Sequence, residues 1–181
     1  MIEVEIKVEV KNREKLEQRL FESGFTKGEL IREEDLYFDT IEDSIRKNDH
    51  ALRLRSSENL TSGEKHHFIT YKGPKLDQIS MTRQELETKI DDANVMKALL
   101  NALGYVKIYP VIKTRQYFAL GEMTACIDSV NDLGEFLELE MVVSEQERAC
   151  ALDKIVGFLE QIGYSREDII RTSYLSMLQK K

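Results

Sequence analysis

The sequence predicts an α+β fold in which eight antiparallel strands close into a β-barrel, with a charged interior and helices packed outside. Three observations support this fold class. Eight segments alternate apolar and polar residues, a period of two that is typical of strands. Three amphipathic segments end in glycine and then an aromatic residue, which is typical of helix C-termini. Charged side chains recur on one face of most of the predicted strands.

Short turns separate most of the predicted strands. Short connections favour antiparallel neighbours, and eight strands are enough to close a barrel. The order is strand, helix and three strands, and it then repeats, which looks like a weak internal duplication. The chain is expected to end in a short helix over 173–179. The strands are expected over 2–10, 30–39, 51–57, 66–73, 81–89, 107–119, 123–130 and 135–143.

The three longer helices carry start signals as well as a shared ending. The first is expected to begin near Asn12, the second near Asp91 or Asp92, and the third at Ser144. Glu147 follows Ser144 by three residues, and the two form a capping-box pattern. At the other end, glycine adopts the left-handed conformation that ends the helix, and the next apolar residue packs on the last turn. The endings are LFESGF (20–25), LNALGY (100–105) and LEQIGY (159–164).

The length of 181 residues predicts a single domain over 1–181. The chain has only 2 prolines and 9 glycines, and no low-complexity linker interrupts it. Its cysteines, Cys126 and Cys150, lack the C-x-x-C spacing of a metal or redox motif. We expect both thiols to be reduced and largely buried, in a cytoplasmic protein.

The net charge of −7 limits the classes of partner. A negative chain is a poor match for nucleic-acid phosphates or for an anionic membrane surface. No apolar run approaches the roughly 20 residues of a transmembrane helix, and the N-terminus lacks the layout of a secretory signal. The sequence therefore argues against nucleic-acid and membrane partners, although it allows a local basic site.

The charged faces of the strands are expected to point into the barrel. In the first strand, the even positions of 2–10 are apolar and the odd positions are charged. Alone, this pattern would fit a surface strand with one face in water. The pattern recurs, however, and three amphipathic helices need an apolar sheet surface to pack on. If the apolar faces filled the barrel, little of that surface would remain, so we expect the ions inside.

The inward set contains equal numbers of bases and acids. Such buried charges are costly unless they are paired, hydrated or bound to a ligand. Two E-x-E pairs, Glu3/Glu5 and Glu138/Glu140, can each aim two carboxylates at one point, which suits Mg²⁺ or Mn²⁺. Arginine and lysine in such numbers suit phosphate oxygens, so the pattern predicts a metal-assisted polyphosphate site. The bases are Lys7, Arg53, Arg55, Lys72, Arg83, Lys113 and Arg115, and the acids are Glu3, Glu5, Glu85, Glu87, Asp128, Glu138 and Glu140.

The E-x-E-x-K string at residues 3–7 opens an ordered set of motifs that covers nearly the whole chain. The others are LYFD (36–39), ALRLR (51–55), TYKGP (70–74), RQELE (83–87), KTR (113–115), LGEFLELE (133–140) after Asp128, and SYLSML (173–178). This set resembles the CYTH superfamily, the triphosphate tunnel metalloenzymes. The YKGP string and the block D-x-V-x-x-L-G-x-F-x-E-x-E resemble most the class IV adenylate cyclase branch.

The resemblance implies an enzyme with Mg²⁺ or Mn²⁺ as cofactor, a small-molecule triphosphate as substrate and a homodimeric state. The role of Arg171 stays open, and Glu85 and Glu87 could either form ion pairs in the tunnel wall or bind metal. The expected metal ligands are Glu3, Glu5, Asp128, Glu138 and Glu140. The expected triphosphate-binding residues are Lys7, Arg53, Arg55, Lys72, Arg83, Lys113 and Arg115. The expected catalytic residues are Glu5, Asp128, Lys72 and Lys113.

The resemblance leaves the reaction open. An adenylate cyclase, which converts ATP to cyclic AMP and pyrophosphate, is the favoured activity. A triphosphatase acting on thiamine triphosphate or tripolyphosphate is the alternative. A module that binds a polyphosphate or nucleotide without turnover is a third candidate, although two intact E-x-E pairs favour catalysis. A plain barrel without a site would instead leave the charged side chains exposed.

Overall fold

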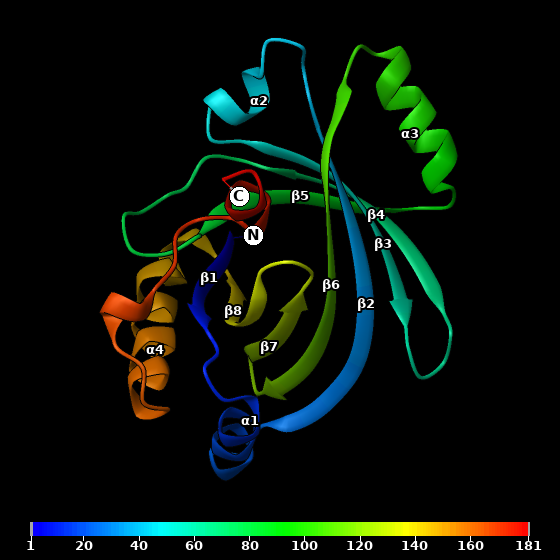
Figure 1. Ribbon diagram of the computed structural model, residues 1–181. Coiled ribbons are helices and arrows are strands. Elements are labelled where there is room, and N and C mark those ends of the chain that lie inside the picture. The colour runs from blue at the N-terminus through cyan, green and yellow to red at the C-terminus, as the bar shows by residue number, and fades with distance from the viewer. Residues whose placement is uncertain (1, 181) are drawn as a thin grey trace.

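The computed structural model describes residues 2–180 and contains the predicted closed, eight-stranded antiparallel barrel with helices outside it (Figure 1). The strand order around the barrel is β1-β5-β4-β3-β2-β6-β7-β8. Neighbours in sequence mostly pair with each other because their connections are short. The strands are β1 (Ile2–Glu9), β2 (Thr26–Asp39), β3 (Ala51–Asn59), β4 (Lys65–Lys72), β5 (Arg83–Ile90), β6 (Val106–Leu120), β7 (Met123–Val130) and β8 (Gly134–Val143).

The helices begin close to their predicted start signals. The Asn12 side chain accepts the N–H of Lys15, and the Asp92 side chain caps the first turn of the second long helix. The capping box of Ser144 and Glu147 is present, but it opens a 3₁₀ turn that leads into the third long helix. The helices are α1 (Arg13–Glu22), α2 (Ser44–Lys47), α3 (Ala93–Ala102), α4 (Arg148–Gln161) and α5 (Tyr174–Leu178), with 3₁₀ turns at η1 (Glu145–Glu147) and η2 (Arg166–Asp168).

The short helix α2 lacks a local start signal, which explains why the sequence pattern does not predict it. Asp43, which precedes it, makes no side-chain cap. The carboxylate of Asp39, at the end of β2, instead accepts the N–H groups of Ile45 and Arg46 at 2.8 and 3.1 Å. The Thr40 hydroxyl accepts the N–H of Ser44 at 3.1 Å, so Asp39 and Thr40, at the end of β2, cap the helix in place of Asp43.

The apolar faces of the strands lie outside the barrel and under the helices. Val4 and Ile6 of β1 are buried on this outer face, together with Leu20 of α1 and Ile155 and Leu159 of α4. Figure 1 shows α1 and α4 on the side of the barrel that β1 and β8 form. The inward orientation of the charged faces is therefore confirmed, because the helices cover the apolar faces.

Two smaller apolar clusters attach α3 and α5 to the barrel. Leu100 of α3 packs with Phe38 and Leu54, on the outer face of β2 and β3. Tyr174 and Leu175 of α5 belong to a cluster with residues of β6, β7 and β8. Among the strands, α5 packs mainly against β6.

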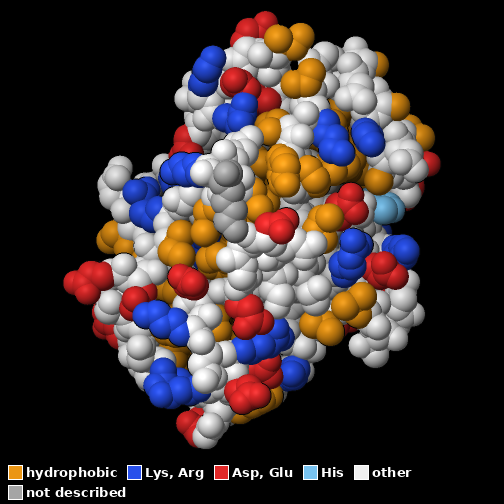
Figure 2. Space-filling view, in the orientation of Figure 1, with side chains coloured by type: hydrophobic (Ala, Val, Ile, Leu, Met, Phe, Trp, Pro, Cys, Tyr) orange, Lys and Arg blue, Asp and Glu red, His pale blue; other side chains and the backbone are white. Residues whose placement is uncertain are grey.

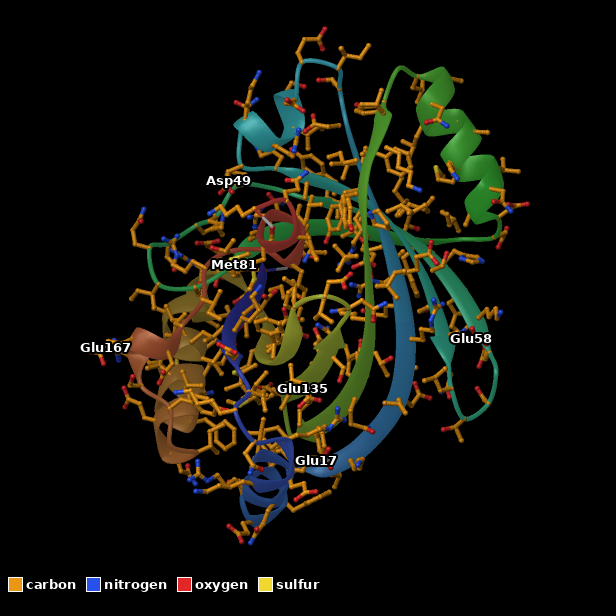
Figure 3. The ribbon with its side chains drawn as sticks, in the orientation of Figure 1. Glu17, Asp49, Glu58, Met81, Glu135 and Glu167 are labelled. Atoms are coloured by element: carbon orange, nitrogen blue, oxygen red, sulfur yellow. The ribbon has the colours of Figure 1, made fainter. Side chains whose placement is uncertain are left out.

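The seam between β1 and β5 is the shortest of the barrel ladders. Only Ile2 pairs with Gln84 and Glu3 with Arg83. Beyond these pairs, the N–H of Met81 donates to the Glu5 carbonyl at 2.9 Å (Met81 is labelled in Figure 3). The segment 73–82 therefore continues the barrel wall next to Glu5.

The described surface corrects one expectation about the cysteines. Cys126 is buried, but Cys150 is exposed at the start of α4. Figure 2 shows acidic and basic side chains interspersed over one face of the molecule. Among residues 2–180, no helix combines the length and apolarity that crossing a bilayer requires.

Candidate active site

The barrel encloses a cavity of about 540 Å³ whose walls carry charges of both signs. All seven bases of the predicted inward set line this cavity. Six of the seven predicted acids also line it, and Asp128 is the exception. The period-two pattern of the strands thus brings together side chains from six strands, β1, β3, β4, β5, β6 and β8.

Three carboxylates converge at one point of the cavity wall. One oxygen from each of Glu5, Glu138 and Glu140 lies within 4.8 Å of the others. Glu5 on β1 lies directly opposite Glu140 on β8, and it is the one acid–acid pair in the strand ladders that the structure describes. Like charges in this position are destabilising unless something neutralises them. Oxygen ligands in this arrangement suit a hard divalent cation.

Two of these carboxylates resist ionisation. Burial and the nearby charge of Glu138 raise the pKa of Glu5 to about 7. Burial, followed by the charges of Glu3 and Glu138, raises the pKa of Glu140 to about 8, although Arg115 opposes the shift. Burial also opposes ionisation of Glu138, but the charges of Arg115, Lys113 and Lys7 outweigh it and lower that pKa. The cluster therefore favours bound protons or a bound cation over three free negative charges.

Glu3 and Asp128 lie outside this three-carboxylate cluster. The Lys72 ammonium donates to Glu3 at 3.5 Å and also forms an ion pair with Glu85. The pKa of Glu3 is lowered to about 2 because the charge of Lys72 and a hydrogen bond from Glu85 outweigh its burial. Of the two predicted E-x-E pairs, the structure brings Glu138 and Glu140 together with Glu5 only.

Asp128 is a fully buried partner of two bases. Its carboxylate accepts from Lys113 Nζ at 2.8 Å, and from Arg115 Nε and Nη2 at 2.7 Å each. The hydroxyl of Tyr174 donates to the same carboxylate at 3.1 Å. Arg115 lies opposite Asp128 in the β6–β7 ladder, so strand register alone brings them together. In this arrangement Asp128 holds Lys113 and Arg115 in place.

Two acids on β2 also pair with the interior bases, and one of them, Asp35, lines the cavity. Both oxygens of Asp35 accept from Arg55, at 2.7 and 2.8 Å. Glu33 accepts from Arg55 at 2.9 Å and lies 3.3 Å from Lys113 Nζ. Neither acid belongs to the predicted inward set. Extending the alternation of β2 backward from Tyr37 would have found both, because 33, 35 and 37 share one face.

The remaining wall acids form ion pairs with neighbouring bases. Glu87 accepts from Arg53 at 3.3 Å and from the Thr70 hydroxyl at 2.6 Å. Glu85 lies opposite Lys72 in the β4–β5 ladder, and burial raises its pKa to about 7 against the charge of Lys72. These contacts favour the wall-pair interpretation for both glutamates over metal binding.

The C-terminal segment supplies groups that the strand pattern does not predict. The ring of Tyr174 lies 4.2 Å from Lys7 Nζ and 5.3 Å from Lys113 Nζ, in cation–π geometry. Arg171 lines the cavity and donates to the carbonyls of Asp77 and Ser80, at 2.8 and 3.4 Å. Arg171 therefore ties the C-terminal segment to the segment 73–82. In the sequence, only the SYLSML string indicated that the C-terminal segment contributes to the site.

Comparisons with known proteins agree with this geometry. The model of the CYTH domain family matches residues 1–174. A protein of Methanocaldococcus jannaschii named "Putative adenylate cyclase MJ0240" is 38% identical over 178 residues, which cover 98% of each chain. The structure of the PH1819 protein from Pyrococcus horikoshii superposes with a TM-score of 0.89 at 32% identity, again over 98% of each chain.

A more distant structure shares the fold. It is the Hippeastrum protein named "Putative adenylyl cyclase HpAC1", which is described with a dominant triphosphatase activity. The TM-score is 0.68 at 18% identity, and the match covers 99% of this chain and 95% of that one.

Replacing Asp128 tests its role as a buried counter-ion. We expect Asp128→Asn to lower the free energy of unfolding of the metal-free protein by about 3 kcal/mol, because Lys113 and Arg115 would lose the fully buried carboxylate that they share. Urea denaturation in EDTA measures this change. The exposed Asp153→Asn on α4 is the control and should change stability little. An unchanged midpoint for Asp128→Asn would contradict the counter-ion role.

The stability of the metal-free protein should fall as the pH rises from about 5 to 8.5. Glu5, Glu85 and Glu140 have folded pKa values of about 7, 7 and 8, above their ordinary value of 4.5. Their contribution to stability is complete below pH 4.5 and is lost as the pH passes through the folded values. Groups whose pKa is lowered, such as Glu3, change the stability only at pH values below this range.

Glu140→Gln should flatten this pH dependence because glutamine cannot ionise. The variant should be more stable than the parent at pH 8.5 and similar to it at pH 5. Urea denaturation curves at the two pH values provide the measurement, with the exposed Glu122→Gln as control. Parallel pH profiles for the parent and Glu140→Gln would show that Glu140 is already ionised near pH 5.

Proposed function

The chain belongs to the CYTH domain family, and from this premise we propose that it is a divalent-metal-dependent enzyme acting on a triphosphate. We propose adenylate cyclase as the activity, with ATP as substrate and cyclic AMP and pyrophosphate as products. One observation carries the proposal: a three-carboxylate cluster lies in the same cavity as seven bases. The relative from M. jannaschii, 38% identical, has a cyclase name and supports the choice of reaction.

Glu5, Glu138 and Glu140 would hold Mg²⁺ or Mn²⁺. Their oxygens already converge within 4.8 Å, and the raised pKa values of Glu5 and Glu140 reflect a local excess of negative charge. The cation would neutralise this charge and polarise the phosphate oxygens. Glu3 stands beside the cluster as a further expected ligand, and Asp128 would act through the bases that it orients.

The bases around the cavity would bind the triphosphate. Their guanidinium and ammonium groups match phosphate oxygens in charge and hydrogen bonding. The bases that line the cavity outnumber the acids, even when Glu33 and Asp128 are counted with the interior. Many of these bases already pair with wall acids, so a triphosphate would bind best together with a cation that neutralises the three-carboxylate cluster. The proposed binding set is Lys7, Arg53, Arg55, Lys72, Arg83, Lys113 and Arg115.

In the cyclase reaction, the ribose 3′-hydroxyl of ATP attacks the α-phosphorus, and pyrophosphate leaves. Lys72 and Lys113 would contact the phosphate oxygens on which charge develops. Both ammonium groups stay protonated, since neighbouring carboxylates raise their pKa against the effect of burial. Most of the catalysis that such a site can supply comes from holding the triphosphate in line for attack and from stabilising the charge that develops on its oxygens.

A triphosphatase is the second candidate function. In that reaction, water attacks the terminal phosphorus of thiamine triphosphate or tripolyphosphate with the same binding groups. The position of the triphosphate relative to the cation decides which phosphorus reacts. The Hippeastrum protein, which shares the fold at 18% identity, is described with a dominant triphosphatase activity and supports this second candidate.

Product analysis separates the two reactions. ATP, thiamine triphosphate and tripolyphosphate are each incubated with Mg²⁺ and with Mn²⁺. We expect cyclic AMP and pyrophosphate from ATP in equal amounts. Orthophosphate without cyclic AMP would instead assign a triphosphatase. If none of the three substrates gives a product, the remaining candidate is a module that binds the triphosphate without turnover.

The double variant Glu5→Gln/Glu140→Gln tests the metal site with little risk to folding, because both side chains have raised pKa values and glutamine resembles the protonated form. We expect kcat/KM to fall about 10³-fold or more, since several kcal/mol of charge stabilisation are lost. Metal-free tripolyphosphate should still bind, as measured by calorimetry in EDTA.

The matched control is Glu122→Gln/Glu167→Gln, which changes two exposed glutamates. Glu167 lies in η2 on the outside of the molecule (Figure 3). This control should retain full activity. Normal turnover in the Glu5/Glu140 variant would remove the metal-site assignment.

A further inference from the structure

Three hydrogen-bond donors converge on one carboxylate at the rim of the cavity. The backbone N–H of Lys75 donates to Asp49 Oδ2 at 2.9 Å, and the Lys75 ammonium donates to Oδ1. The Arg83 guanidinium donates to the same Oδ1 at 3.2 Å. All three residues line the cavity, and Figure 3 labels Asp49 on the segment between α2 and β3. Asp49 thus brings a negative charge to the rim of a site that is proposed to bind anions.

The donors around Asp49 form the kind of group that binds a phosphate. A backbone N–H, an ammonium and a guanidinium offer charge-assisted hydrogen bonds to several oxygens of one tetrahedral anion. Arg83 is largely buried, with 8% of its surface exposed, so it needs an anionic partner in the free protein. The Asp49 side chain is 44% exposed and can turn towards solvent when another anion arrives.

The donors are held in place by contacts other than the Asp49 carboxylate, and Arg83 donates to the backbone carbonyl of Asp49 at 2.8 Å. Gly73 N–H donates to the Gln84 carbonyl at 2.9 Å and Leu76 N–H to that of Thr82 at 3.0 Å, which fixes the backbone on both sides of Lys75. Arg83 also donates to the Gly73 carbonyl at 3.1 Å. A group of donors that keeps its shape when the carboxylate leaves is preorganised for a second anion.

We propose that Lys75 and Arg83 form an outer phosphate subsite and that Asp49 occupies it in the free protein as an internal competitor. The outermost phosphate of the bound triphosphate displaces the Asp49 carboxylate from these donors. This inference rests on the proposed function, because it assigns a subsite and a means of regulation to the same cavity. Competition from Asp49 lowers the affinity of the free protein for anions that bind only at the rim of the cavity.

The backbone at Asp49 makes a clean test possible. Its φ of +58° lies in the left-handed region, which asparagine and glycine also adopt. Asp49→Asn therefore removes the charge and retains the shape, and Asp49→Gly removes the side chain without backbone strain. Asp132, with φ of +63° in the β7–β8 turn, does not line the cavity. Asp132→Asn is thus a control with the same charge change and the same backbone conformation.

Calorimetric titration with tripolyphosphate and Mg²⁺ measures the effect. We expect Asp49→Asn and Asp49→Gly to bind about fivefold more tightly than the parent protein, because the phosphate no longer displaces a carboxylate. Asp132→Asn should bind like the parent. Lys75→Gln should bind more weakly, and adding Asp49→Asn to it should change the affinity by less than twofold, since the subsite is already lost.

The outcomes separate this inference from the proposed function. If the parent binds tripolyphosphate but Asp49→Asn binds equally or less tightly, then Asp49 positions the two bases and the competitor role is overturned. An equal gain in Asp132→Asn would also overturn it, because the effect would then be general electrostatics. If neither the parent nor any variant binds tripolyphosphate, the proposed function is wrong, and the outer phosphate subsite is excluded as well.

Discussion

Mutual neutralisation of charges across neighbouring strands is the constraint on which this structure depends. Arg55 lies opposite Asp35, Arg115 opposite Asp128, and Lys72 opposite Glu85 in the ladders of the barrel. Each pair is buried or half-buried, where an unpaired ion would cost several kcal/mol. A one-residue slip of any of these strands would move its charges under the apolar helices. The strand register and the charge pairing therefore stabilise each other.

The exception to this rule marks the candidate metal site. At the opposed pair of Glu5 and Glu140, the barrel places acid against acid, and burial keeps both carboxylates from ionising at their ordinary pKa. Elsewhere the bases already have partners, so an incoming phosphate must compete with internal carboxylates such as Asp35 and Asp49. Under the proposed function, an anion and a cation would bind best when they arrive together.

The helices contribute more than a cover for the apolar outer face. The ring of Tyr174 on α5 contacts Lys7 and Lys113 from the C-terminal segment, and its hydroxyl reaches Asp128. The closed barrel and the C-terminal segment therefore act as one unit in holding the bases. This arrangement explains why the SYLSML string belongs with the strand motifs although it lies at the end of the chain.

Residue patterns alone predict which face of each strand carries ions, where the long helices begin, and that the apolar faces need helices over them. These features follow from local periodicity and capping, which neighbouring residues encode. The partners of each charged side chain depend on how the strands are arranged in the folded barrel. The tertiary structure places Glu5 with Glu138 and Glu140 but Asp128 with Lys113 and Arg115, adds Glu33 and Tyr174 to the interior, and caps α2 with Asp39. Strand register and barrel closure set these long-range contacts, and no local pattern contains them.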